Sequence, residues 1–160
     1  ASERPVLMSH VGARTLWDTN RMKSDDAIKA VAAGGGLIGI EAAPHTTLTA
    51  AHPRHSIASV MEHFEYVAGL VGLDHVSFGP DTLYGDHVGL HHAYAAQLSI
   101  GATHKGPTFD EVPYVEGLEN PTECFPNIIR WLVSHGYGRE EIAKVVGKNA
   151  MRVLAATWAS

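Results

Sequence analysis

The sequence predicts an α/β fold in which parallel strands alternate with helices and two further helices close the chain. Three short runs of residues are apolar throughout rather than alternating, which is typical of strands buried on both faces of a parallel sheet. Segments with apolar residues at helical spacing separate these runs, so the order is strand, helix, strand, helix, strand. This order predicts parallel strands joined by helical crossovers.

Each predicted strand ends close to a polar residue. The strands are Pro5 to Ser9, followed by His10; Leu37 to Ile40, followed by Glu41; and Val76 to Gly79, followed by Pro80 and Asp81. In a parallel α/β barrel, side chains just past the carboxyl ends of the strands converge on one mouth, where catalysis takes place. Imidazole and carboxylate groups there suit zinc. A hydrogen-bonded histidine at a strand end is the alternative for His10, and the pattern assigns no role to Glu41.

The predicted helices have cap signals or a helical period. Ser24 can cap the first, which has Asp25 and Asp26 in its first turn and stops at the glycines of residues 34–36. The other predicted helices are 56–70, 125–135 and 139–158, the last broken near Gly147. Cys124, at the start of an apolar helix, is expected to be a small buried residue rather than a catalytic one.

Residues 82–120 show no clear periodicity apart from a candidate short helix at 90–98. A stretch of this length is typical of a functional loop, and after the last strand it would form a lid over the mouth. It contains Asp86 and four histidines: His87, His91, His92 and His104. Adjacent histidines point apart, so His87 with His91 is the better-spaced metal pair. Solvated or hydrogen-bonded histidines in a lid or subunit contact are the simpler interpretation.

Composition excludes several classes of partner. The net charge of −5 comes from interspersed acidic and basic residues, which offers no basic stripe for nucleic acid. No apolar run approaches the roughly 18 residues of a membrane span, and the first residues form no hydrophobic signal, so we expect a soluble chain without a membrane partner. The single cysteine excludes an internal disulfide and fits a reducing compartment, which makes the cytoplasm the expected location.

Three segments resemble the zinc-dependent membrane (renal) dipeptidase family, in its bacterial type, and together they span nearly the whole chain. They are Pro5-Val-Leu-Met-Ser-His10 with Thr19-Asn-Arg21-Met and Asp25-Asp26; Phe78-Gly79-Pro80-Asp81, where the family has Phe-Gly-Gly-Asp; and Gly117-Leu118-Glu119 with the closing Gly147-Lys-Asn149-Ala-Met-Arg-Val-Leu154. The resemblance implies the C-terminal part of a (β/α)8 TIM-like metal-hydrolase barrel. Of that barrel this chain would hold about three parallel strands with their crossover helices and two C-terminal helices.

The resemblance also implies roles for three residues. The family hydrolyses dipeptides with two zinc ions that activate water and polarise the peptide carbonyl. His10 would be a zinc ligand. Arg21, eleven residues after His10 as in the family, would bind the C-terminal carboxylate of the dipeptide through its forked guanidinium. Asp81 would be catalytic, contacting the substrate amine and shuttling a proton to the leaving nitrogen. A surface loop residue for Arg21 and a strand-end cap for Asp81 are the alternatives.

The family's other ligands have no counterpart here: a His-x-Asp pair, a bridging glutamate and a second histidine upstream of the His10 position. A complete barrel takes about 250 residues. We therefore expect residues 1–160 to be one partial domain that supplies the C-terminal half of the active site and is inactive as an isolated segment. A missing N-terminal half or companion chain would supply the rest, and a homo-oligomer is expected.

Two other readings compete with this one. The chain could be a non-catalytic remnant or interaction subunit of a split barrel of this kind. It could also fold alone as a small three-stranded binding module. This is disfavoured because the sheet would have two edge strands with unpaired backbone groups and an exposed apolar face.

Overall fold

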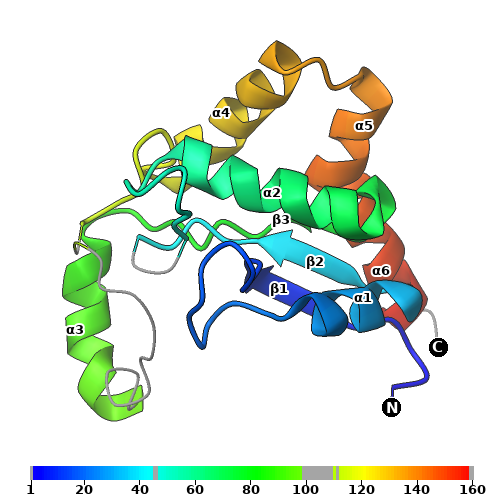
Figure 1. The fold of residues 1–160 in the computed structure, drawn as a ribbon, viewed down its shortest axis with the longest axis horizontal. Helices are drawn as coiled ribbons and strands as arrows, with labels where there is room; N and C mark the ends of the chain where they lie inside the picture. The colour runs from blue at the N-terminus through cyan, green and yellow to red at the C-terminus, as the bar shows by residue number, and fades with distance from the viewer. Residues whose placement is uncertain (1, 45–46, 99–109, 111, 159–160) are drawn as a thin grey trace.

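Three parallel strands form one sheet at the centre of the molecule (Figure 1). The computed structural model describes residues 2–44, 47–98, 110 and 112–158. The strands are β1 (Leu7–Val11), β2 (Leu37–Ile40) and β3 (Val76–Phe78), in the order β1-β2-β3. Both pairings are parallel, which confirms the predicted α/β fold class. All three carboxyl ends therefore lie at the same edge of the sheet.

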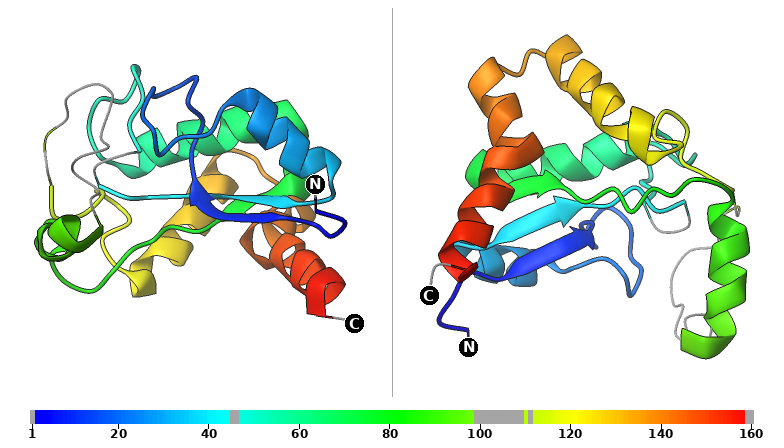
Figure 2. Two further views of the ribbon diagram at one scale, coloured as in Figure 1. Left: turned by 90° about the horizontal axis from the view of Figure 1, so that it is seen from below. Right: turned by 180° about the vertical axis from the view of Figure 1, so that it is seen from behind.

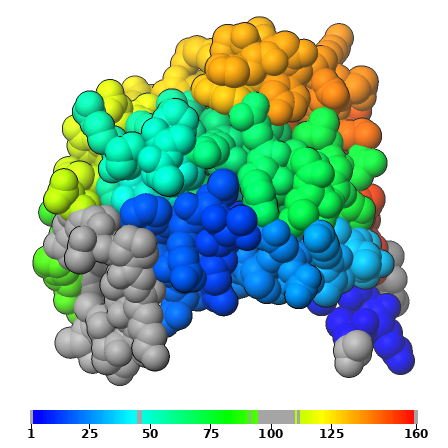
Figure 3. Space-filling model, viewed as in Figure 1, coloured from blue at the N-terminus to red at the C-terminus, as the bar shows by residue number. Residues whose placement is uncertain are grey.

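Two crossover helices connect the strands, and they lie side by side over the sheet (Figures 1 and 2). Helix α1 (Asp25–Ala33) joins β1 to β2, and α2 (Ile57–Val71) followed by the 3₁₀ turn η1 (Leu73–His75) joins β2 to β3. Ser24 caps α1 as predicted, because its hydroxyl accepts the Ala27 N–H at 3.3 Å. Figure 3 shows the segment that follows β1, in blue, packed beside α2, in green.

The chain after β3 is mostly helical. Its elements are α3 (His87–Leu98), α4 (Pro121–Ser134), α5 (Arg139–Ala143), the π-helical turn η3 (Lys144–Lys148) and α6 (Asn149–Trp158). In Figure 1, α3 stands apart from the rest of the molecule, on the side of the strands' carboxyl ends. The predicted lid segment is thus helical over 87–98. The predicted break near Gly147 is the π-helical turn, which lies between α5 and α6.

Helix α4 begins at Pro121 rather than at Phe125 because Asn120 caps it. The Asn120 carboxamide oxygen accepts the N–H groups of Thr122 and Glu123 at 3.0 and 3.2 Å. Proline at the first helical position needs no hydrogen-bond acceptor there. Cys124 consequently lies within the first turns, and its side chain is fully buried, as expected.

The core lies between the sheet and the helices. The β2 side chains Leu37, Ile38 and Ile40 are fully buried. Phe64 of α2 stacks on Phe78 of β3, with ring centroids 4.9 Å apart. This contact packs helix α2 against the last strand of the sheet.

Apolar side chains are exposed at the start of β1, which lies at one edge of the sheet. Val6 is 44% and Leu7 46% exposed, whereas all of β2 is buried. An edge strand that presents unpaired backbone and apolar side chains is suited to pairing with a further strand. Among the described helices, none combines the length and apolarity needed to cross a bilayer.

Candidate active site

Backbone hydrogen bonds tie the carboxyl ends of the three strands together. The Glu41 N–H donates to the Val11 carbonyl at 3.0 Å, which links β2 to β1. The Ala42 N–H donates to the Pro80 carbonyl at 2.9 Å, which links the end of β2 to the segment that carries Asp81. The three polar positions expected at the mouth, His10, Glu41 and Asp81, thus lie on one hydrogen-bonded framework.

His10 lies in a bulge of β1. The pairing with β2 shifts between Met8 and Val11, so that Ser9 and His10 together oppose the single residue Gly39. The strand ends at Val11, so His10 lies within it and not just past its end as predicted. The Ser9 hydroxyl is 2.6 Å from His10 Nδ1. This contact leaves Nε2 as the ring nitrogen that makes no hydrogen bond within the described residues.

The bulge is packed against glycines from both other strands. A Cβ atom built on Gly79 would overlap the Ser9 carbonyl oxygen and lie 3.4 Å from the His10 Cβ. One built on Gly39 would lie 2.9 Å from the Ser9 carbonyl carbon. Glycine at these two positions is what allows His10 to lie close to the end of β3.

Arg21 binds a partner that the sequence did not suggest. Its Nε–H donates to Glu41 Oε2 at 2.9 Å, in an ion pair whose carboxylate is fully buried and whose arginine side chain is 40% exposed. Arg21 belongs to the loop between β1 and α1. Two hydrogen bonds close this loop: Arg14 N–H to the Lys23 carbonyl and Lys23 N–H to the Gly12 carbonyl, both 2.9 Å. Arg21 therefore lies next to the carboxyl end of β2, where its partner is Glu41.

Asp81 has a left-handed backbone conformation, and it is the only described non-glycine residue with a positive φ. Its φ is 59°, in the left-handed region. Aspartate tolerates this region better than most residues, yet the conformation still costs free energy and is enriched at functional sites. Its side chain is exposed and makes no hydrogen bond or ion pair within the described part of the chain. The carboxylate is therefore available to a ligand.

The described residues do not by themselves form a metal site. Within the described residues, no group of three or more histidine, cysteine and acidic side chains is close enough to hold a metal ion. Protein zinc sites take three or four side-chain ligands. His10 has the features of one of them, because a ligating histidine usually directs its other ring nitrogen to a hydrogen-bond partner, here Ser9.

The histidines of residues 82–120 form no metal-binding group with these residues in the described region. His87 is buried, at 5% exposure, in a small hollow beyond the ends of β2 and β3 that Ala42 and Thr82 also line. His104 and the side chain of His91 lie outside the described residues, so the suggested pairing of His87 with His91 stays a prediction.

His63 of α2 is a buried histidine whose role the sequence did not reveal. Its Nδ1 accepts the Ala13 N–H at 3.0 Å, so Nε2 carries the proton and donates to the Leu48 carbonyl at 2.9 Å. Burial lowers the His63 pKa, and the Leu48 hydrogen bond opposes this only in part. The neutral ring thus connects the loop that carries Arg21 to the loop that follows Glu41. The sequence could have predicted this burial, because His63 lies among the apolar positions of α2.

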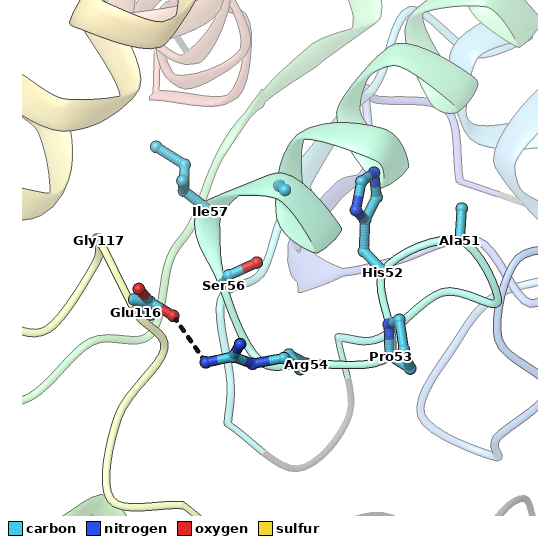
Figure 4. Close-up of a pocket in the computed structure, with 9 residues that line it drawn as sticks. Ala51, His52, Pro53, Arg54, Ser56, Ile57, Glu116 and Gly117 are labelled. Carbon is cyan, nitrogen blue, oxygen red and sulfur yellow. Dashed lines mark ion pairs between the residues drawn. The ribbon is translucent and has the colours of Figure 1, made fainter.

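A larger hollow, of about 460 Å³, lies where α2 begins (Figure 4). Figure 4 shows Arg54 and Glu116 paired across it, 3.7 Å apart, with side chains that are 85% and 69% exposed. Such an exposed ion pair contributes little binding energy. Since α2 starts at the mouth side of the sheet, this hollow forms part of the outer rim and not of the strand-end group.

Comparisons with known proteins identify the family of this chain. The family model described as "Membrane dipeptidase (Peptidase family M19)" matches residues 1–98 and 86–159. Dipeptidase aclJ of Aspergillus oryzae is 28% identical over 150 residues, which are 94% of this chain and 29% of that protein. The chain thus spans less than a third of that relative.

Solved structures share the fold. An amidohydrolase from Pseudomonas aeruginosa has a TM-score of 0.79 and 28% identity, over 99% of this chain and 47% of its own. A metallo peptidase from Rhodobacter sphaeroides, liganded with a phosphinate mimic of the dipeptide L-Ala-D-Ala, has a TM-score of 0.71 and 19% identity, over 98% of this chain and 37% of its own. The family match, which extends over nearly the whole chain, shows that the chain belongs to the membrane dipeptidase family, peptidase family M19.

Proposed function

We propose that this chain supplies the C-terminal half of the active site of a zinc-dependent dipeptidase. The observation that carries the proposal is the convergence of His10, Arg21 and Asp81 on one edge of the sheet, held by hydrogen bonds between the strand ends. Membership of a metallopeptidase family supports a metal in that place, and we propose two zinc ions in the complete enzyme.

Each of the three residues has one task in this proposal. His10 binds a zinc ion through Nε2 while Ser9 orients the ring. When bound, the zinc ions supply an activated water and polarise the peptide carbonyl. Arg21 binds the C-terminal carboxylate of the dipeptide, and Asp81 contacts its amine and passes a proton to the leaving nitrogen. The exposure of both side chains supports these roles.

The remaining metal ligands come, in this proposal, from an N-terminal barrel half, in the same polypeptide or in a companion chain. The exposed apolar side chains of Val6 and Leu7 support pairing of β1 with a preceding strand. Zinc requires more ligands than His10 alone provides. The same reasoning predicts no dipeptidase activity from residues 1–160 in isolation.

We also propose that the segment of residues 82–120 forms a lid or a contact between subunits of a homo-oligomer, in the cytoplasm. Three of its tyrosines support a contact role because they are large and exposed: Tyr84 at 72%, Tyr94 at 49% and Tyr114 at 50%. Aromatic residues are enriched in protein interfaces.

The test is zinc content and dipeptide hydrolysis of this chain assembled with the N-terminal half. We expect about two zinc ions per assembly by elemental analysis. His10→Ala should lose zinc and activity, and Arg21→Ala should lose activity while keeping zinc. The matched controls are His135→Ala, directly after α4, and Arg139→Ala, at the start of α5, both away from the mouth. An assembly that folds but binds no stoichiometric zinc would instead favour the non-catalytic interaction subunit.

A further inference from the structure

Glu41 is a buried acidic residue at the centre of the mouth. Its side chain has no exposed surface, and it directly follows β2, the middle strand. Hydrogen bonds to Val11 and Pro80 hold its backbone and that of Ala42 on both sides. A carboxylate placed in a low-dielectric site on so rigid a support requires a compensating partner.

Arg21 is that partner, and the contact has a defined geometry. The Nε–H of Arg21 donates to Glu41 Oε2 at 2.9 Å, and the Thr47 hydroxyl lies 3.4 Å from Oε1. A hydrogen bond between two charged groups is among the stronger ones a protein makes. Because the carboxylate is buried and the arginine side chain is 40% exposed, Glu41 is the fixed member of the pair and Arg21 the one that reaches the solvent.

The contact uses only one edge of the guanidinium group. Arginine has five N–H donors in a planar fork, and the Nε–H lies on the side of that fork. The terminal Nη1 and Nη2 groups donate no hydrogen bond within the described residues. They form the pair of parallel donors that binds a carboxylate through both oxygens.

We propose that Glu41 is a positioning residue that holds Arg21 with its Nη1 and Nη2 groups directed at the C-terminal carboxylate of the substrate. This inference rests on the proposed dipeptidase function. An unrestrained arginine side chain loses considerable rotamer entropy when it binds a ligand, and a buried acceptor removes that loss in advance. Glu41 also offsets the charge of Arg21, so the site selects a carboxylate by the geometry of its donors more than by net charge.

The test compares a dipeptide with the same dipeptide carrying a C-terminal carboxamide, in the complete zinc-loaded enzyme. Only the free acid can use the Arg21 fork. Glu41→Met removes the acceptor at similar volume, and it should reduce the acid-to-amide ratio of kcat/KM by about 10- to 100-fold through a higher KM for the acid. Glu41→Gln keeps an acceptor for Nε–H and should retain the ratio within a few-fold. Glu65→Met, on the exposed face of α2, is the matched control.

The outcomes separate the inference from the proposed function. A Glu41→Met enzyme in which acid and amide slow equally would have a purely structural defect, and it would overturn the positioning role. Wild-type enzyme that hydrolyses neither substrate would overturn the dipeptidase function and the inference with it. If Glu41→Met does not fold, Glu41→Asp decides: the shorter side chain keeps the negative charge but withdraws the acceptor from Arg21 Nε–H, so loss of the ratio supports positioning and its retention refutes it.

Discussion

Replacement of Gly79 by alanine tests the close packing of the strand ends. The added methyl group would overlap the Ser9 carbonyl oxygen and lie 3.0 Å from the Ser9 carbonyl carbon. Both are main-chain atoms of the bulge, and Gly39 is also close to it, since a Cβ added there would lie 2.9 Å from the same carbon. The strands therefore have no flexible side chain that could move aside.

The expected cost follows from that geometry. Overfilling a packed site costs about 1–3 kcal/mol when side chains give way. Here backbone must move, so we expect the upper end, about 3 kcal/mol. For a domain of this size that lowers Tm by about 6–12 °C. Because His10 lies 3.4 Å from the new methyl group, zinc binding in the assembled enzyme should weaken as well.

The assay is thermal unfolding of matched preparations, with Gly69→Ala as the control. Gly69 lies inside α2, and nothing is within 4 Å of a Cβ added there. Alanine at an exposed helical position should stabilise by about 0.5–1 kcal/mol and raise Tm by about 1–4 °C. A Gly79→Ala protein that melts at or above the wild-type temperature would refute the packing argument.

Three further predictions concern buried polar groups. Arg21→Met should destabilise by about 3 kcal/mol because it removes the guanidinium that pairs with the buried Glu41 carboxylate. Glu41→Met should cost less than about 1 kcal/mol because Arg21 can be hydrated. Urea unfolding that gives the reverse order would contradict this. Burial lowers the His63 pKa below 6.5, so the neutral ring contributes to the free energy of unfolding above that pH, and this contribution is lost as pH falls. The urea midpoint should therefore drop more between about pH 7.5 and pH 5 in wild type than in His63→Gln. Burial raises the Cys124 pKa to about 11, so a thiol reagent at about pH 8 should label this thiol only after denaturation. Rapid labelling of the folded protein would show that the packing around Cys124 opens.

Local signals in the sequence predicted the elements that have clear boundaries. The strand of residues 37–40 was predicted with its exact ends because it is an apolar run between Gly36 and Glu41. The helix after Ser24 was predicted because serine and two aspartates mark its start. Helix α4 was placed too late because Asn120 and Pro121 were not read as a cap and a first turn.

The parts of the site that depend on tertiary contacts were harder to predict. The bulge at Ser9 and His10 is packed closely because Gly39 and Gly79 allow two other segments to approach the Ser9 carbonyl group. No pattern within one segment of the sequence predicts this contact. The pairing of Arg21 with Glu41 joins residues from a loop and from the next strand end. A carboxylate directly after an apolar strand is nevertheless a signal, since burial at that point requires a cation.

The two hydrogen bonds of His63 have a mechanical consequence. One imidazole ring, carried by α2, holds Ala13 at one nitrogen and Leu48 at the other. The loops that bear Arg21 and follow Glu41 are thereby coupled to the same helix. A small rigid-body shift of α2 would carry both loops in the same direction while hydrogen bonds to the neighbouring strands hold Glu41 in place, so the shift would change the position of the guanidinium relative to the carboxylate.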